Sequence, residues 1–266
     1  MKRFITIAAL VAASTAFADA KSEIPSALQD DSLVLFYDFS TGAGANKGSS
    51  SMTNSFSRVE DGQYGTLSGS GPYTTGASSF GMKANAFTVS FDVSSASLSN
   101  WTNLLSIYTN GTTYGDNNAL MLQQNNAGSI MLYVGAIGGT TSYFGGASAG
   151  ANATILSTSD ISGSEWKTIT FTSDGEKFVV YVDGKQTATA SLATTSEAIT
   201  GFQFGSAFGG SRALTSASFD NIAFWNKTLT AAEVASLFPT IPEPSAFGLL
   251  AGLGALAFAV SRRKRR

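Results

Sequence analysis

The feature that most restricts the fold of this chain is an alternation of apolar and polar residues with a period of two. Residues 87–93 read Phe-Thr-Val-Ser-Phe-Asp-Val, so Phe87, Val89, Phe91 and Val93 fall on one face of an extended strand. Similar short runs occur at 33–39, 119–122, 130–134, 166–171, 178–182, 185–192, 201–205 and 218–225. Roughly ten such strands, separated by Gly, Asn and Ser turns, predict an all-β chain folded as a two-sheet antiparallel sandwich or jelly roll.

Turn residues support this interpretation. Asp174-Gly175 and Asp183-Gly184 each separate two predicted strands. Glycine accepts a positive φ without steric cost, so both dipeptides favour hairpins. Residues 40–86 and 136–164 are rich in Gly, Ser and Thr, and we expect long loops or short edge strands there.

One short C-terminal helix is predicted after the last strand. Thr230 and Glu233 have the spacing of a capping box, in which each side chain accepts a hydrogen bond from the first turn. Val234, Leu237 and Phe238 follow at helical spacing, so we expect one face of this helix to pack on a sheet.

The N-terminus has the three parts of a secretory signal peptide. A basic start, Met1-Lys2-Arg3, precedes an apolar segment over 4–17, and Ala18 and Ala20 fit the small-x-small cleavage pattern. A transmembrane helix is the alternative, but the segment is too short for one. We therefore expect residues 1–20 to be removed after export by the secretory translocon.

The C-terminus also has three parts. Pro242 and Pro244 hold Glu243 in an extended peptide, because proline fixes its own φ and restricts the residue before it. An apolar segment follows over 246–260, which is short compared with the about 20 residues of a spanning helix. The chain then ends in a cluster of cations that favours the cytoplasmic side of a membrane: Arg262, Arg263, Lys264, Arg265 and Arg266.

This order of segments over 241–266 resembles the PEP-CTERM sorting signal of Gram-negative bacteria. The resemblance implies recognition by a membrane-embedded exosortase, transient insertion of the tail in the inner membrane, and a mature protein at the cell surface or outside the cell. It also makes exopolysaccharide a partner to consider, because this sorting system accompanies exopolysaccharide production. A simple C-terminal membrane anchor is the alternative.

The composition excludes several kinds of chemistry. Residues 21–241 hold nine Lys and Arg (sixteen, less two in the signal peptide and five in the tail). They hold sixteen Asp and Glu (eighteen, less Asp19 and Glu243), so the net charge is about −7 and argues against a nucleic-acid partner. The chain has no Cys and no His, which excludes disulfides, Ser-His-Asp and Cys-His catalysis, and His-ligated zinc.

A second resemblance covers residues 31–238 as an ordered set of short patterns. Three of these patterns are similar to the laminin G/concanavalin A-like superfamily: Trp166-Lys-Thr-Ile-Thr-Phe, Val180-Tyr-Val-Asp-Gly-Lys and the closing segment 219–233. The resemblance implies a jelly-roll domain over 21–240 with a concave face. It also implies loops that bind carbohydrate in many members, in some of them through calcium.

The sequence does not predict an enzyme. Glycosidases need two carboxylates that flank the scissile bond, and hydrolases of the resembled superfamily carry them on one strand as Glu-x-Asp-x-x-Glu. That motif is absent, and the acidic pairs 30–31, 60–61 and 174/176 stand beside turn residues. An active site with two carboxylates from distant strands stays an open alternative.

Residues 101–118 form the candidate binding site, because sugar sites combine aromatic faces with a few fixed polar groups. The candidate glycan contacts are Trp101, Tyr108, Tyr114, Asp116, Asn117 and Asn118. Asp116 and Asn118 also offer the oxygen ligands that calcium prefers. The alternative is an ordinary polar loop with Trp101 and Tyr108 partly in the core, where we also place Trp166 and Trp225.

The sequence thus predicts an exported, non-catalytic adhesion module that binds carbohydrate and is sorted by an exosortase. A structural matrix protein with no specific ligand is the alternative, and a glycoside hydrolase or lyase is less favoured.

Overall fold

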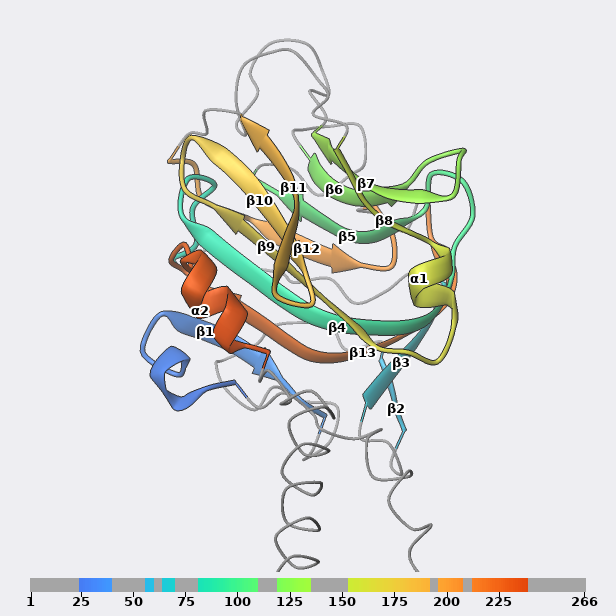
Figure 1. Cartoon of the computed structure of the whole chain (residues 1–266), viewed down its shortest axis with the longest axis horizontal. Coiled ribbons are helices and arrows are strands. Elements are labelled where there is room, and N and C mark those ends of the chain that lie inside the picture. The colour runs from blue at the N-terminus through green and yellow to red at the C-terminus, as the bar shows by residue number, and fades with distance from the viewer. Residues whose placement is uncertain are drawn as a thin grey trace, which may run out of the picture.

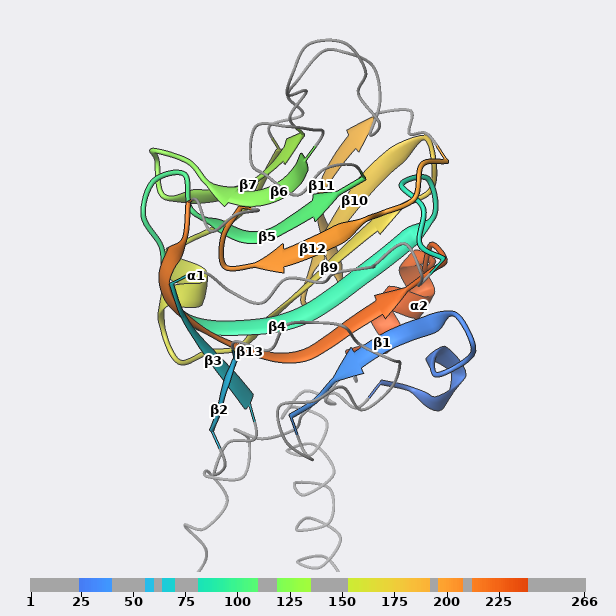
Figure 2. The same ribbon diagram turned by 180° about the vertical axis from the view of Figure 1, so that it is seen from behind.

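The computed structural model describes residues 24–39, 56–59, 64–69, 81–109, 119–134, 153–191, 196–207 and 212–238. Two antiparallel sheets lie face to face (Figures 1 and 2), which confirms the predicted jelly-roll sandwich. The predicted signal peptide and sorting tail lie outside the described residues. Within the described ranges, no helix has the length and apolar character needed to cross a membrane.

The larger sheet has eight strands in the order β11-β10-β9-β4-β13-β3-β2, with β1 also paired to β13. Its strands are β1 (Leu33–Tyr37), β2 (Ser57–Val59), β3 (Tyr64–Gly69), β4 (Phe87–Ser97), β9 (Lys167–Ser173), β10 (Lys177–Val182), β11 (Lys185–Ser191) and β13 (Leu214–Trp225). The smaller sheet has five strands in the order β12-β5-β6-β7-β8. These are β5 (Asn103–Tyr108), β6 (Ala119–Gln124), β7 (Ser129–Val134), β8 (Ala153–Ser157) and β12 (Gly201–Phe204).

The core lies between the two sheets, where the predicted alternation is confirmed. Phe87, Val89, Phe91 and Val93 of β4 are all fully buried. The ring of Phe91 lies 5.5 Å from that of Phe204 on β12, so the two sheets meet through aromatic contacts. Burying such side chains contributes about 1.5–3 kcal/mol each.

The predicted hairpins are confirmed, and the turn between β10 and β11 shows why the sequence favours them. Asp183 has φ 49° and Gly184 has φ 73°, and they directly join Val182 to Lys185. Two central residues with positive φ form the turn whose twist matches that of the flanking strands, and Asp-Gly suits it.

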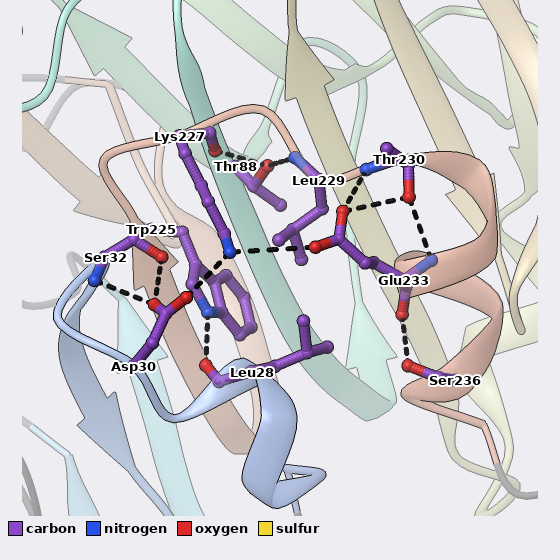
Figure 3. Close-up of polar contacts among 10 residues, drawn as sticks. All are labelled: Leu28, Asp30, Ser32, Thr88, Trp225, Lys227, Leu229, Thr230, Glu233 and Ser236. Atoms are coloured by element: carbon purple, nitrogen blue, oxygen red, sulfur yellow. Dashed lines mark hydrogen bonds and ion pairs between the residues drawn. The ribbon is translucent and has the colours of Figure 1, made fainter.

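The chain termini of the domain are held together on the outer face of the larger sheet (Figure 3). The segment with η1 (Ser26–Leu28) and helix α2 (Ala231–Ser236) both pack over an outer apolar cluster that includes Leu33, Val179 and Trp225. Trp225 Nε1 donates to the Leu28 carbonyl at 2.9 Å, which confirms that Trp225 is a core residue.

Ion pairs and a capping box also hold the two ends of the domain together. We call this arrangement of Asp30, Lys227, Thr230 and Glu233 the clasp. Lys227 Nζ lies 2.9 Å from Asp30 Oδ2 and 3.6 Å from Glu233 Oε1. The Ser32 hydroxyl, and after it the Lys227 ammonium, hold the pKa of Asp30 well below its usual value. The Thr230 backbone N–H, which donates to Glu233 at 2.7 Å, likewise lowers the pKa of Glu233. The predicted capping box is therefore present and is tied to the N-terminal segment.

The sequence left several elements unassigned. Residues 103–108 form strand β5, although we expected a polar candidate loop there; Leu104, Leu105 and Ile107 supply the apolar side chains that bury it. Within the two Gly-, Ser- and Thr-rich regions lie the strands β2, β3 and β8 and the short helix α1 (Ser159–Ser162).

The prediction that Trp166 is a core residue is wrong. Trp166 stands one residue before β9 and is 36 % exposed. Its ring lies 5.4 Å from the ring of Tyr64 on β3, at an interplanar angle of 70°. A strand pattern alone does not show that the strand begins at Lys167, so the sequence could not distinguish this residue from one inside the sheet.

Candidate functional site

The structure places the predicted aromatic contacts Trp101 and Tyr108 at opposite ends of β5. Trp101 precedes the strand and Tyr108 is its last residue, and six residues of strand span about 20 Å. Tyr108 is 1 % exposed and pairs with both Ala119 and Gly201, so it offers no ring face to a ligand. That predicted contact is therefore wrong.

The other residues predicted for this site lie outside the described part of the chain: Tyr114, Asp116, Asn117 and Asn118. Glycan contact at these positions, and calcium at Asp116 and Asn118, stay predictions. Among the described residues, no three Asp, Glu or His side chains lie close enough together to hold a metal ion.

Trp101 is an exposed aromatic residue held in an unfavourable backbone conformation. Its side chain is 43 % exposed and its φ is 68°. A bulky residue with positive φ costs about 1–3 kcal/mol, and such strain persists only where the surroundings enforce it. The Trp101 N–H donates to the Gln124 carbonyl at 2.9 Å, and Gln123 Nε2 donates to the Trp101 carbonyl at 3.1 Å. The end of β6 therefore fixes this residue from both sides.

A chain of side-chain hydrogen bonds starts at the same place. Gln123 Nε2 donates to Asn103 Oδ1 at 2.8 Å, and Asn103 Nδ2 donates to Ser106 Oγ at 3.2 Å. The Ser106 hydroxyl then donates to the Ser206 carbonyl at 3.0 Å. We call this chain the amide relay; it runs from β6 across β5 to the residues that follow β12.

A register shift in β5 creates the amide relay. Leu105 and Ile107 face the core, so regular alternation would turn Asn103 toward the core as well. The β5–β6 pairing is irregular between Asn103 and Leu105, which brings the Asn103 amide to the same side as the Ser106 hydroxyl. The sequence carries no local signal for this bulge.

Several buried acceptors of the smaller sheet lack a partner. In the described part of the chain, Gln123 Oε1, Gln124 Oε1, Thr109 Oγ1 and Ser206 Oγ are buried without a hydrogen bond. Each such group costs about 1–3 kcal/mol unless a water or a ligand satisfies it. Gln123 and Gln124 contact the backbone of Trp101. With Asn100, which accepts a long 3.5 Å hydrogen bond from Gln124 Nε2, these residues form what we call the Trp101 rim.

The larger sheet brings together two carboxylates from distant strands, an alternative that the sequence left open. Asp92 on β4 and Asp220 on β13 lie opposite each other. Asp92 accepts hydrogen bonds from the Thr168 hydroxyl and from Asn221 Nδ2, the latter at 2.7 Å, and Asp220 accepts from the Asn221 N–H at 2.9 Å. The carboxyl groups are thus held within the sheet, and the two residues are only 8 % and 4 % exposed.

This pair therefore serves the sheet. Asn221 has φ 47° and lies in a bulge of β13, which lets its amide reach Asp92. The neighbouring outer-face hydroxyls of Ser90 and Thr170 also bond to each other at 2.8 Å. Buried polar groups that are satisfied in this way stabilise a sheet and leave no group to recognise a ligand.

Two family profiles match the sequence of the chain. The profile of the concanavalin A-like lectin/glucanases superfamily matches residues 67–235, and that of the PEP-CTERM protein-sorting motif matches residues 240–266. No curated protein matches the chain.

Several solved structures share the fold. Trypanosoma rangeli sialidase is similar with a TM-score of 0.55 at 18% identity over 81% of this chain and 33% of its own. The binding domain of Paraclostridial Mosquitocidal Protein 1 has a TM-score of 0.56 at 16% identity, over 78% of this chain and 52% of its own. Domain 4 of AbnA, a GH43 extracellular arabinanase from Geobacillus stearothermophilus, was solved in complex with arabinotriose. Its TM-score is 0.52 at 15% identity, over 78% of this chain and 98% of that domain.

At these identities the likeness concerns the fold alone, and the chain spans about a third of the length of the sialidase. The superfamily match is more extensive, since it runs from β3 to α2 and covers more than half of the chain, including the Trp101 rim. The chain belongs to the concanavalin A-like lectin/glucanases superfamily and carries a PEP-CTERM protein-sorting motif at its C-terminus.

Proposed function

We propose that this protein is a non-catalytic adhesion module that binds glycan through the Trp101 rim. The PEP-CTERM motif indicates export and surface sorting in a Gram-negative bacterium. On this proposal the secretory translocon exports the precursor and an exosortase-type enzyme recognises its C-terminal tail. Exopolysaccharide at the cell surface is then the ligand.

One observation carries the proposal: an exposed tryptophan is held at a strained φ by hydrogen bonds to the end of β6. A sugar ring presents an apolar face, which can cover an exposed indole. Strain at a bulky residue is found where the surrounding structure needs a side chain in one place. The Trp101 rim supplies such an aromatic face beside the paired ends of β5 and β6.

Two further observations support a non-catalytic role. The chain has no His and lacks the Glu-x-Asp-x-x-Glu pattern. Asp92 and Asp220 are the carboxylates that the sheet brings together, and Thr168 and Asn221 occupy them with hydrogen bonds. The arabinanase domain that shares the fold was solved with a bound arabinotriose, which is consistent with an oligosaccharide as the ligand class.

A binding experiment with matched tryptophan variants tests the proposal. The full chain in detergent micelles is applied to a polysaccharide and glycan array with and without calcium, as wild type, Trp101→Ala and Trp166→Ala. Trp166 is the matched control because it is also exposed, and its ring packs on Tyr64 of β3 in the larger sheet. We expect Trp101→Ala to lose at least about tenfold in affinity, as buried aromatic anchors do, and Trp166→Ala to bind as the wild type.

Equal binding by wild type and Trp101→Ala would reject the rim as the site. A requirement for calcium would instead support the predicted contacts at Asp116 and Asn118. Absence of binding by a folded protein would favour the alternative, a structural matrix component, with which the low charged fraction of 13% is compatible.

A further inference from the structure

Both ends of the described domain lie on the outer face of the larger sheet. Side chains of β10 alternate between the two faces of the sheet: Val180 packs in the core between the sheets, whereas Val179 belongs to the outer apolar cluster. Ile24, near the N-terminus, and Leu237, directly after α2, are buried in this same outer cluster. The chain therefore enters and leaves the domain on the side of the larger sheet that faces away from the smaller sheet.

Helix α2 fixes the point at which the chain leaves. Val234 is fully buried, and Lys227 of the clasp links the helix to Asp30 through ion pairs (Figure 3). After the helix, Phe238 packs against the outer apolar cluster. Its ring lies so close to Gly184 that a Cβ there would be 2.8 Å from Phe238 Cδ2. The end of the domain is thus held beside the turn between β10 and β11.

The connection from this point to the apolar segment of the tail is short. Seven residues, 239–245, separate Phe238 from Ala246. Eight Cα–Cα steps span at most about 29 Å, since an extended chain advances by at most about 3.6 Å per residue. The headgroup layer takes up about 5–8 Å of this length when Ala246 lies at the hydrocarbon boundary. Phe238 can therefore stand at most about 24 Å above the lipid surface.

The domain is wider than this reach. Residues 24–238 are 215 residues, and a compact domain of this size has a radius of gyration of about 17 Å and a diameter of about 44 Å. With the smaller sheet against the membrane, Phe238 would stand on the far side of the domain, about 44 Å above the lipid. The connection is too short for that orientation.

We infer that, while the tail is inserted, the outer face of the larger sheet around α2 is the surface that faces the lipid headgroups of the inner membrane. This inference rests on the insertion of residues 246–260, which belongs to the proposed sorting of the chain. Trp101 lies on the other side of the domain, since it precedes β5 and bonds to the end of β6, both in the smaller sheet. The Trp101 rim is then directed away from the membrane and is open to a polymer before the tail is processed.

The predicted signal peptide favours the same orientation. Its cleavage position at Ala20 lies four residues before Ile24, which is buried in the outer apolar cluster. Four residues extend over at most about 14 Å, so the N-terminal apolar segment also joins the domain close to this face. Both apolar segments of the precursor therefore pull the same face of the domain toward the membrane.

Energy transfer from single-cysteine variants to labelled lipid tests the orientation. The chain has no Cys, so one introduced thiol can be labelled uniquely. The matched variants are Ala235→Cys on α2 and Ala127→Cys in the turn between β6 and β7, both at exposed alanines. Each is purified with its tail from a Gram-negative host without exosortase and labelled with a donor dye. It is then reconstituted in phosphatidylethanolamine and phosphatidylglycerol vesicles that carry a rhodamine acceptor on a lipid headgroup.

We expect the donor at 235 to lie about 20 Å closer to the lipid surface than the donor at 127, because a helix diameter and a sheet spacing, each about 10 Å, separate the two positions. The control is the same pair of variants with about 30 Gly and Ser residues inserted between 239 and 240, which raises the reach of the connection well above the diameter of the domain. In the control chain the difference between the two donors should disappear.

Equal distances for the two donors, or a shorter distance for Ala127→Cys, in the chain without the insertion would overturn the inference. A difference that persists after the insertion would overturn it too, since direct contact with lipid and not the short connection would then orient the domain. Failure of the folded chain to associate with vesicles would remove its basis, the inserted tail. No glycan takes part in this measurement, so its failure is distinct from a failure of the proposed glycan binding on the array.

Discussion

Replacement of Phe91 by Ala tests the interior of the sandwich. Phe91 lies on β4 of the larger sheet and is fully buried. Its ring is 5.5 Å from that of Phe204 on β12, edge to face at 86°, and 5.9 Å from that of Phe219 on β13. The variant therefore removes a contact that joins the two sheets and one that joins two strands of the same sheet.

The expected loss in the free energy of unfolding is about 3–5 kcal/mol. A buried Phe→Ala substitution costs this amount because apolar burial is lost and a cavity is left. Two aromatic pairs, each contributing about 0.5–1.5 kcal/mol beyond the buried area, favour the upper part of the range. Since domains of this size are stable by only about 5–15 kcal/mol, the change should be large in any unfolding curve.

Urea denaturation followed by circular dichroism measures this loss. The slope of free energy against urea should stay unchanged, so that the shift in midpoint reports stability alone. Trp166→Ala, a truncation of a partly exposed aromatic residue that packs on Tyr64, is the control and should cost less than Phe91→Ala. A loss of less than about 1 kcal/mol for Phe91→Ala would refute the assigned facing of β4.

Three further predictions concern the clasp, a turn and the tail. Because the folded-state pKa values of Asp30 and Glu233 are lowered, their stabilisation is present above their unfolded pKa values and is lost as pH falls through the folded ones. The melting temperature should therefore drop below about pH 4, and less steeply in Asp30→Asn; an identical pH profile in this variant would contradict the assignment. Gly205→Ala should cost about 1–3 kcal/mol in urea unfolding, since Gly205 has φ 69° and a Cβ there would collide with Leu67; an unchanged midpoint would show that this turn relaxes freely. Glu243→Ala should leave the precursor in the inner membrane on cell fractionation, because the sorting enzyme loses the acidic group between the two prolines, and normal release would reject the sorting signal.

The candidate site was only partly predictable. Trp101 could be named as a candidate because aromatic residues within an Asn- and Thr-rich stretch are typical of sugar sites, and contact with a glycan at Trp101 stays a prediction. Gln123 and Gln124 were missed because they look like the polar end of a strand. Their place beside Trp101 depends on hydrogen bonds to Trp101 and Asn103, which lie just before and at the start of a different strand. The error at Tyr108 arose in the same way, because its burial depends on neighbouring strands.

The sequence by itself determined the features that depend on residues a few positions apart. The alternation in β4, the Asp183-Gly184 turn and the Thr230 capping box all follow from local sterics and local hydrogen bonds, and all three are present. The C-terminal sorting motif was readable for the same reason, since it depends only on the order of its residues. The superfamily was recognisable because several such local patterns occur in one order along the chain.

Only the tertiary structure decided which strands pair, where the register shifts, and which side chains remain exposed. The bulge that turns Asn103 toward Ser106 and the one that brings Asn221 to Asp92 result from fitting strands distant in sequence into one sheet. No local preference encodes them, because each arises from packing and backbone hydrogen bonds across strands.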